Sequence, residues 1–538
     1  MQIQTIAFPP FDDQRPGTSG LRKTVRHYQQ PHYAESFLQA IFNTLGIAGK
    51  TVVVGGDGRY FNDSVIQTLI RMAAAQGAAR LIVGENGLLS TPATSHIIRH
   101  YQADYGIILS ASHNPGGQDG DFGIKFNLAA GQPAPESVTE AVYAETQRLG
   151  EYRIADIAAP ALAIGEHQLG DTCLSVISST ADYVEMLAGL FDFDAIRAYL
   201  RDHKLLFDAM HAVTGPYAKA LLHATLGLEE KYLLNTQPQP DFGGGHPDPA
   251  PDTAKALQKR MQDDPAIVMG AASDGDGDRN MVCGRTHLIN PCDSLAIIAD
   301  RHTAIPALRN LKGVGRTMPT SRAIDLVTAK HGLTCYETPT GWKFFGNLLE
   351  AGHIQLCGEE SFGTSGDHIR EKDGLWAVMC WLSILAASGK TPDAILEEHW
   401  QTYGRHHFNR FDYENLDKPQ AEAMLAAFEK DLGKMLGQSW HGLAITNAGQ
   451  FRYTDPTNGE QTGNQGLQIQ FGRQARIITR LSGTSSSGAT LRIYCEYWQQ
   501  DISKPAALPG TTATLAAFAQ GAMNIAEHCG RHQPDHIV

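Results

Sequence analysis

The chain has 538 residues, and 44 Lys and Arg against 57 Asp and Glu give it a formal net charge of −13 at pH 7. This length is too great for one hydrophobic core, so we expect three or four domains. The acidic balance argues against nucleic acid and anionic membranes as partners. The eight cysteines lack the Cys-x-x-Cys spacing of a zinc ribbon, and no apolar signal-peptide core follows Met1. We therefore expect a reduced, cytoplasmic protein.

The first predicted elements alternate between strand and helix. Residues 51–54 and 81–83 are short apolar runs, and the segment 64–76 between them has helical periodicity. This order predicts one βαβ unit of a parallel sheet.

A candidate nucleophile follows the next strand. Residues 105–109 form an apolar run typical of a buried parallel strand, and Ser112 comes directly after it. Ligands gather beyond the carboxyl ends of such strands. The turn at 114–117 is expected to expose the Ser112 hydroxyl. The Ser112-His113 pair is weak evidence by itself, since sequence neighbours rarely act as nucleophile and base.

Strand and helix signals recur further along the chain. Residues 204–208 and 267–269 read as strands, with a helix after Pro216 between them. A helix over 322–330 and a strand over 353–357 predict a third unit.

Three carboxylates stand at alternate positions after the strand at 267–269. In extended chain Asp274, Asp276 and Asp278 share one face, and Gly275 and Gly277 allow the loop to curl so that the carboxylates converge. A few carboxylates together with a phosphate oxygen are ligands that Mg²⁺ prefers.

Two alternatives compete with this magnesium site. An EF-hand calcium loop starting at Asp274 fails on spacing, because Arg279 and Arg285 occupy the positions of its glycine and its last glutamate. An acidic surface turn without metal stays open on the carboxylates alone. Arg279, directly after three anions, favours a site that also holds a phosphate or a hydroxyl.

Two later segments carry polar groups suited to a sugar phosphate. Residues 358–363 follow the strand at 353–357 and offer carboxylates and a hydroxyl for sugar hydroxyls, although any polar turn can look similar. Residues 480–492 place hydroxyls and glycines between two arginines, which suits a phosphate dianion; the alternative is a flexible Ser/Gly linker. The apolar run 375–387 lies between them and is too short for the ~20 residues that span a bilayer, so we expect a buried helix.

Seven motifs in this order resemble the α-D-phosphohexomutase superfamily, and specifically its phosphoglucomutase branch. The motifs are Pro16–Arg22, Leu109–Gly117, Asp274–Arg279, Thr338–Phe345, Gly358–Gly363, Asp367–Trp376 and Arg480–Arg492. One departure concerns the phosphate loop, where Ser485 replaces the second glycine of the family's Gly-Thr-Gly-Ser. If that glycine needs a positive φ, we expect the loop to be strained or differently shaped.

The resemblance implies an α/β fold with four domains around a central cleft. Three are expected to be similar mixed-sheet α/β domains, and the fourth a C-terminal α+β lid that closes over the sugar. With turns along the chain as a guide, the ranges are 1–180 with the phosphoserine loop, 181–290 with the metal loop, 291–403 with the sugar loop, and 404–538 with the phosphate loop.

The resemblance also implies a reaction. Phosphorylated Ser112 gives its phosphoryl group to O6 of α-D-glucose 1-phosphate and so forms bound glucose 1,6-bisphosphate. The bisphosphate turns end for end, returns its 1-phosphate to Ser112, and leaves as glucose 6-phosphate. Mg²⁺ held by Asp274, Asp276, Asp278 and the serine phosphate stabilises the charge on the transferring group.

The remaining site residues follow from their places in the family motifs. Lys372 is the expected proton acceptor for the sugar hydroxyl, provided that neighbouring cations or burial lower its pKa, and His113 and Lys125 support the nucleophile. The expected substrate-binding residues are Arg22, Arg279, Thr340, Gly341, Glu359, Ser361, Arg480, Ser482, Thr484, Ser486 and Arg492. Arg22 is expected to point into the site; otherwise its Gly-Thr-Ser-Gly setting reads as a flexible N-terminal turn.

Other functions stay open at this point. The sugar could be mannose or a hexosamine, because related branches share the nucleophile and the metal loop. A non-enzymatic scaffold is the alternative from another class, although Ser112, the three aspartates and Lys372 are all present. A phosphorylated hexose is the expected partner, and the chain is expected to be a monomer or a weak dimer.

Overall fold

The computed structural model describes residues 1–17, 19–485, 488–508 and 510–538. The chain forms two compact units. The first unit comprises Met1–Leu288, Arg301–Asn310 and Ser361–Pro392, and the second comprises Ile289–Asp300, Leu311–Glu360 and Asp393–Val538.

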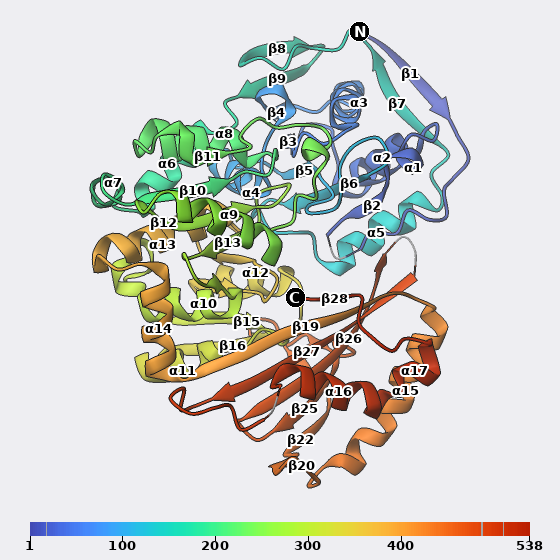
Figure 1. Ribbon diagram of the computed structural model, residues 1–538. Coiled ribbons are helices and arrows are strands. Elements are labelled where there is room, and N and C mark those ends of the chain that lie inside the picture. Colours follow the sequence, from blue (N-terminus) through green and yellow to red (C-terminus); the bar gives the residue numbers. More distant parts are fainter. Residues whose placement is uncertain (18, 486–487, 509) are drawn as a thin grey trace. The chain divides into compact units, whose positions relative to one another are not determined.

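The first unit begins with a seven-stranded mixed sheet (Figure 1). Its strands are β2 (Leu21–Thr24), β3 (Thr51–Gly56), β4 (Arg80–Gly84), β5 (Tyr105–Leu109), β6 (Asp121–Leu128), β8 (Gly165–Leu169) and β9 (Thr172–Ile177). They lie in the order β2-β6-β5-β3-β4-β9-β8. β3 runs parallel to β4 and β5, so the carboxyl ends of β3 and β5 meet at one edge of the sheet, where Ser112 follows β5.

Helices pack their apolar side chains against this sheet and form a hydrophobic core with it. The helices are α1 (Val25–Tyr28), α2 (Tyr33–Leu45), α3 (Asn62–Ala75), α4 (Thr91–His100) and α5 (Glu136–Thr146). In α3 the residues Val65, Ile66, Leu69 and Ile70 recur at helical spacing, and all four are buried. Burying each such side chain contributes about 1.5–3 kcal/mol. A separate two-stranded antiparallel sheet pairs β1 (Gln2–Ala7) with β7 (Glu151–Asp156).

A second sheet of the first unit carries the acidic loop. It contains β10 (Lys204–Asp208), β11 (Leu233–Leu234), β12 (Ile267–Ser273) and β13 (Asn280–Cys283), with helices α6 (Ala181–Leu190), α7 (Phe193–Leu200), α8 (Thr214–Ala218) and α9 (Pro251–Asp263). β12 is parallel to β10 and antiparallel to β13, so the chain reverses between Ser273 and Asn280. β18 (Thr364–Gly366) and α13 (Gly374–Ser388) also belong to this unit, and the chain leaves it within β14 (Leu288–Ile289).

The second unit contains a parallel sheet and its helices. The strands are β15 (Gly313–Thr317), β16 (Thr334–Thr338) and β17 (Leu356–Gly358), and the helices are α10 (Pro291–Asp300), α11 (Ala323–His331), α12 (Lys343–Glu350) and α14 (Pro392–Tyr403). Both β16 and β17 pair in parallel with β15. The loops after β16 and β17 therefore leave the same edge of this sheet.

The C-terminal part of the second unit is an antiparallel sheet, drawn in orange and red in Figure 1. Its strands are β19 (Arg405–Leu416), β22 (Asn447–Gln450), β25 (Leu467–Phe471), β26 (Ala475–Ser485), β27 (Gly488–Gln499) and β28 (His536–Ile537), and its helices are α15 (Lys418–Met435), α16 (Thr512–Met523) and α17 (Ile525–Cys529). Leu491 and Ile493 of β27 pack into the same core as Leu515 of α16. Because side chains alternate along a strand, Arg492 and Tyr494 lie on the other face.

Most of the predicted elements are confirmed. The strands expected at 51–54, 81–83, 105–109, 204–208 and 267–269 are β3, β4, β5, β10 and β12, and the helices expected at 64–76, 322–330 and 375–387 are α3, α11 and α13. The strand expected over 353–357 is partly wrong, because the His353 amide donates to Leu348 and closes the turn after α12, so that β17 begins only at Leu356.

The helix near Pro216 starts earlier than expected. α8 begins at Thr214 and continues as π-helix through Lys219–Thr225. Proline is tolerated in the first turn of a helix, where its missing N–H would have no intrahelical partner.

Among the described residues, no helix is long and apolar enough to cross a membrane.

Candidate active site

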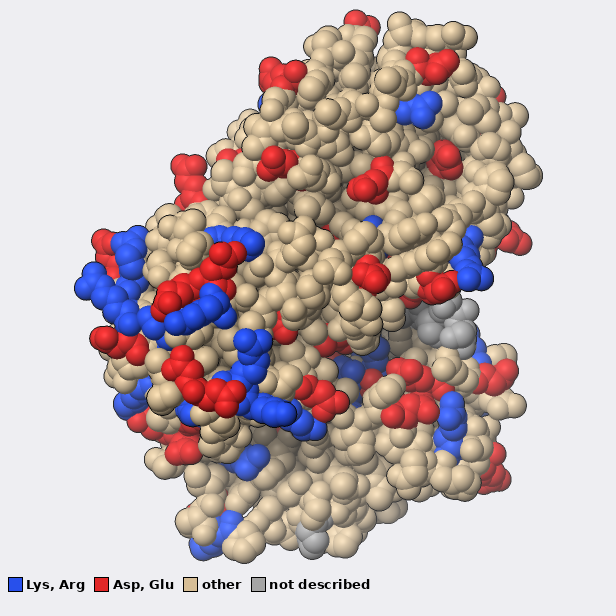
Figure 2. All heavy atoms as spheres, turned by 45° about the horizontal axis from the view of Figure 1, so that its top comes forward, with Lys and Arg blue, Asp and Glu red and all other residues tan. Residues whose placement is uncertain are grey.

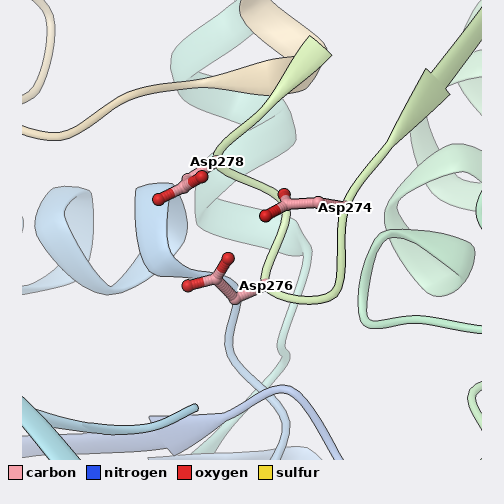
Figure 3. Close-up of side chains that lie close together, drawn as sticks. All are labelled: Asp274, Asp276 and Asp278. Carbon is pink, nitrogen blue, oxygen red and sulfur yellow. The ribbon is translucent and has the colours of Figure 1, made fainter. Parts of the chain in front are cut away.

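The acidic loop brings its three carboxylates together, as the sequence predicts (Figure 3). Asp274, Asp276 and Asp278 are all buried, and one oxygen of each lies within 4.8 Å of the others. Gly277 has φ +80°, a left-handed conformation that turns the loop back. A side chain at Gly275 would place its Cβ 2.4 Å from the Ser112 carbonyl oxygen, so this glycine permits close packing against the nucleophile loop.

Lysines offset the repulsion between these buried anions. The Nζ atom of Lys125 lies 2.7 Å from Oδ2 of Asp276, and that of Lys372 lies 3.2 Å from Oδ2 of Asp278. Burial and the carboxylates of Asp278 and Asp276 raise the pKa of Asp274 well above its usual value. The pKa of Asp276 lies below its usual value. Burial acts to raise this pKa, but the Lys125 ammonium, together with the hydrogen bond from Thr91, has the larger effect.

Two oxygens of the cluster fit a bound cation. Oδ1 of Asp276 and Oδ1 of Asp278 are buried and have no hydrogen-bond partner among the described residues. Unpaired carboxylate oxygens are costly in a protein interior, and oxygen-only donor sets suit hard divalent cations. The residues present therefore fit a cation of the Mg²⁺ type.

Ser112 reaches this cluster from the carboxyl end of β5. Its Oγ donates to Oδ2 of Asp274 at 3.0 Å. The expectation that the following turn exposes Ser112 is wrong, because the residue is only 3% exposed, and Gly275 of the acidic loop packs against its carbonyl. The Ser112 backbone has φ +54°, which is uncommon outside glycine and occurs where surrounding contacts impose it.

Sequence reasoning missed a buried arginine that binds the Ser112 backbone. Arg59 is 1% exposed and donates to the carbonyl oxygens of Ser112 at 2.6 Å and Asp121 at 2.9 Å. Asp57 pairs with Arg59 at 2.8 Å and accepts from Ser110, whose Oγ in turn accepts from the Ser112 amide. A signal for this contact was present in the sequence. An Asp-Gly-Arg run directly follows β3, and because β3 and β5 are parallel, the run lies at the same sheet edge as the serine loop.

His113 and Arg279 flank the serine. Nδ1 of His113 lies 3.4 Å from Oγ of Ser112, and Nε2 lies 3.5 Å from Arg279. Burial, followed by the nearby charge of Arg279, lowers the pKa of His113 well below its usual value, so its imidazole is neutral. Arg279 pairs with Asp248 at 2.9 Å, a partner that the sequence reasoning did not identify.

A further buried acid lies beside Lys372. Glu371 is 4% exposed and accepts a hydrogen bond from Asn127 at 2.9 Å. Burial raises its pKa to about 7, while Lys125 acts in the opposite direction. The segment that carries Lys372 is thus fixed through its preceding residue.

Arg22, which is expected to point into the site, interacts electrostatically with the acidic loop. It lies on β2, and its Nε is buried without a hydrogen-bond partner among the described residues. Burial lowers its pKa, while the carboxylates of Asp276 and Asp278 act in the opposite direction. Gly20 packs so tightly on β6 that a Cβ there would lie 2.5 Å from the Ile124 carbonyl oxygen, which argues against the flexible-turn alternative for the described residues.

The expected sugar residues follow strands. Thr340 and Gly341 lie between β16 and α12; Gly341 has φ +124°, and Oγ1 of Thr340 is buried without a partner among the described residues. Glu359 follows β17 in the second unit and is 7% exposed. Ser361 belongs to the first unit, two residues before the bridge between Gly363 and Arg279.

The expected phosphate residues lie on a hairpin. Arg480 and Ser482 are in β26 and Arg492 is in β27, with Arg480 directly opposite Arg492 in the pairing. The linker alternative is therefore wrong for the described residues. Thr484 lies within β26, where only its backbone is described, and Ser486 falls outside the described residues. Ser485 pairs with Gly488, and the predicted strain at this position stays a prediction.

Comparison with known proteins extends this geometry to the whole chain. The domain models described as phosphoglucomutase/phosphomannomutase alpha/beta/alpha domains I, II and III match residues 13–153, 181–287 and 291–403, and the phosphoglucomutase-1 C-terminal domain matches residues 405–535. The phosphoglucomutase of Rhizobium radiobacter is 47% identical over 541 residues, which cover 100% of both chains. That of Aspergillus fumigatus is 46% identical over 99% of this chain and 100% of its own.

The chain belongs to the phosphoglucomutase family.

A solved structure agrees with this membership. The open form of the exocytosis-sensitive phosphoprotein pp63/parafusin, a phosphoglucomutase from Paramecium, has a TM-score of 0.90 at 42% identity and covers 100% of this chain and 99% of its own. The fold expected from the sequence is confirmed: this phosphoglucomutase-family chain has three α/β/α domains and a C-terminal domain.

Proposed function

We propose that the chain is a phosphoglucomutase that interconverts α-D-glucose 1-phosphate and glucose 6-phosphate through phosphorylated Ser112 and bound glucose 1,6-bisphosphate. The observation that carries the proposal is the hydrogen bond from Oγ of Ser112 to Asp274 inside a buried cluster of three carboxylates. Such a cluster beside a hydroxyl nucleophile suits phosphoryl transfer, which depends mainly on positioning and charge stabilisation. The enzyme is accordingly an isomerase that acts by intramolecular phosphotransfer.

The residues that hold the cation are Asp274, Asp276 and Asp278, joined by a phosphate oxygen of phosphorylated Ser112. The two unpartnered Oδ1 atoms support this set. A bound Mg²⁺ supplies Lewis-acid stabilisation of the charge that develops on the transferring phosphoryl group.

The protein's own cations and its histidine surround the nucleophile. Arg22 and Arg279 bind the phosphoryl oxygens, and Lys125 keeps Asp276 ionised through their 2.7 Å contact. His113, neutral and 3.4 Å from Oγ of Ser112, can accept the hydroxyl proton.

Lys372 is the group that takes the proton from the attacking sugar hydroxyl and returns it in the reverse direction. Its Nζ atom lies 3.2 Å from Oδ2 of Asp278, which supports a place beside the transferring phosphoryl group. In this role the neutral amine of Lys372 takes the proton as the sugar O6–H bond breaks and O6 forms its bond to phosphorus. The phosphorus–Oγ bond of Ser112 breaks in the same step, and the departing Oγ takes up a proton to become the serine hydroxyl.

The sugar and its second phosphate bind to the remaining residues. Thr340, Gly341, Glu359 and Ser361 hold ring hydroxyls, while Arg480, Ser482, Thr484, Ser486 and Arg492 hold the distal phosphate. The opposed pair of arginines on β26 and β27 supports the phosphate role. One phosphate site that serves both poses of the bisphosphate explains how a single serine acts on both ends of the sugar. Residues 404–538 are proposed to act as the lid that keeps water from the phosphoryl group.

The proposal extends to domain ranges, location and partners. The ranges 1–180, 181–290, 291–403 and 404–538 are supported by where the four domain models match. All eight cysteines lie among the described residues and none forms a disulfide, which supports a reducing, cytoplasmic location. On the face drawn in Figure 2, most Lys and Arg side chains lie among Asp and Glu, which argues against nucleic acid or an anionic membrane as a partner of that face. The proposed partner is a hexose phosphate. We propose a monomer or weak dimer.

The test is the Mg²⁺-dependent conversion of glucose 1-phosphate to glucose 6-phosphate, with and without trace glucose 1,6-bisphosphate. We expect fast turnover that needs the bisphosphate for full rate. Faster turnover of mannose 1-phosphate in a parallel assay would reassign the sugar. Absence of turnover in folded protein under every condition would support the scaffold alternative, as would absence of serine phosphate by intact mass.

A further inference from the structure

A threonine at the start of α4 contacts one of the three carboxylates. Thr91 is fully buried, and its Oγ1 donates to Oδ2 of Asp276 at 2.7 Å. Its backbone amide also donates to the Asp276 carbonyl oxygen at 2.9 Å. Figure 3 shows Asp276 beside the first turn of a pale blue helix, which these contacts identify as α4.

The two oxygens of Asp276 differ as a result. Oδ2 accepts from both Thr91 and Lys125, each at 2.7 Å. Oδ1 is buried and has no hydrogen-bond partner among the described residues. Of the two donors, the lysine ends a flexible four-carbon side chain, whereas the threonine is stiff at χ1 and sits on a helix capped by Ser90.

We propose that Thr91 is a positioning residue for the cation site: its hydroxyl fixes the rotation of the Asp276 carboxylate so that Oδ1 points to the cation. This inference rests on the proposed function, because it requires a divalent cation among the three aspartates. Groups that hydrogen-bond to a metal ligand orient it, and their removal weakens metal affinity by about 10- to 100-fold.

The backbone amide and the side-chain hydroxyl of Thr91 make separate hydrogen bonds to Asp276, so a side-chain substitution can test the hydroxyl alone. Thr91→Val keeps the shape of the side chain and the hydrogen bond from the backbone amide to the Asp276 carbonyl oxygen. It removes only the hydrogen bond from the hydroxyl to the Asp276 carboxylate. Thr91→Ser keeps that bond and loses a methyl group. Thr94 provides the matched control, because it is fully buried one turn later in α4 and its Oγ1 donates to the Ser90 carbonyl oxygen at 2.9 Å.

The experiment measures Mn²⁺ binding to the full chain by the loss of the free-ion electron paramagnetic resonance signal. The binding that disappears in Asp278→Asn defines the site. We expect Thr91→Val to weaken Mn²⁺ binding about 10-fold, Thr91→Ser to stay within about threefold of the unmodified chain, and Thr94→Val to leave it unchanged. If Thr91→Val does not fold, Thr91→Ala is measured in its place with the same expectation.

The outcomes separate this inference from the function on which it rests. Unchanged Mn²⁺ binding in Thr91→Val, or an equal loss in Thr91→Ser, overturns the positioning role and leaves the cation site intact. Failure of the unmodified chain to bind Mn²⁺ at the aspartates overturns the cation site and the inference together.

Discussion

In the acidic loop, two of the three buried carboxylates lie 2.7 and 3.2 Å from lysines of the same unit, whereas in the β26–β27 hairpin two arginines stand opposite each other. Asp412 of β19 is the residue paired with Arg492 across the strands, but its carboxylate forms an ion pair with Arg410 at 2.8 Å. Nε of Arg492 is buried without a hydrogen-bond partner among the described residues.

The two regions differ in how far the protein itself neutralises the charges that bind the ligand. The acidic loop is largely neutralised by the protein, so its geometry is set before a cation arrives. The hairpin keeps a positive charge that a phosphate dianion can neutralise. We therefore expect changes in the acidic loop to act mainly on turnover and metal affinity, and changes in the hairpin to act mainly on substrate affinity.

The largest effect is expected at the nucleophile. Ser112→Ala removes the hydroxyl that carries the phosphoryl group, so turnover should fall by more than about 1000-fold. The fold should survive, because the loss is one hydrogen bond worth about 1 kcal/mol. Steady-state rates and thermal unfolding check both statements, and normal turnover in this variant contradicts the phosphoserine assignment.

The next effect tests the acidic half of the comparison. Asp274→Asn removes one of the three charges, so we expect Mn²⁺ affinity and turnover each to fall by roughly 100-fold. Asp252→Asn, at an exposed position in the first turn of α9, is the control. Equal and small effects of the two variants would show that the acidic loop does not act as a cation site.

The hairpin half is tested at Arg492. Arg492→Ala loses charge-assisted hydrogen bonds to phosphate, so we expect the KM for glucose 1-phosphate and for glucose 6-phosphate to rise roughly 10- to 100-fold, with a smaller change in kcat. Arg473→Ala, at the exposed turn between β25 and β26, is the control. An effect on only one of the two substrates rules out a phosphate site shared by both poses.

The smallest effect concerns a buried carboxylate on α10. Asp293 on α10 is 4% exposed and accepts from Nε1 of Trp400 at 3.1 Å, and burial raises its pKa to about 6. The folded chain therefore holds this proton more tightly than the unfolded chain. Stability is lost as the pH rises from about 4 to about 6, and the loss is constant above.

Asp293→Asn keeps the acceptor and removes the charge. We expect a free energy of unfolding higher by on the order of 1–2 kcal/mol at pH 7 and little difference near pH 4. Thermal unfolding across this pH range checks the sign. A variant that is less stable at pH 7 would show that the Asp293 carboxylate stabilises the fold.

The sequence predicts those parts of the molecule that depend on local pattern. The apolar run at 105–109 and the helical periodicity of 64–76 give β5 and α3, and the alternation of Asp and Gly from Asp274 gives a convergent acidic loop. Such features arise from neighbours in the chain, so they are visible in the sequence.

Contacts between distant segments are not visible in this way. The burial of Ser112 depends on Gly275, and its backbone carbonyl binds Arg59, which lies 53 residues away in the chain. Thr91 is 185 residues from Asp276. Single residues of common types give no periodic signal, so only the fold shows that they meet.

The most direct test of the central claim is the intact mass of the dephosphorylated chain after incubation with glucose 1,6-bisphosphate and Mg²⁺, with the modified residue located by peptide mapping. Our account predicts the gain of one phosphoryl group on Ser112 and none in Ser112→Ala. A chain that gains no phosphoryl group while it interconverts the two glucose phosphates, or that gains one at another residue, would contradict it.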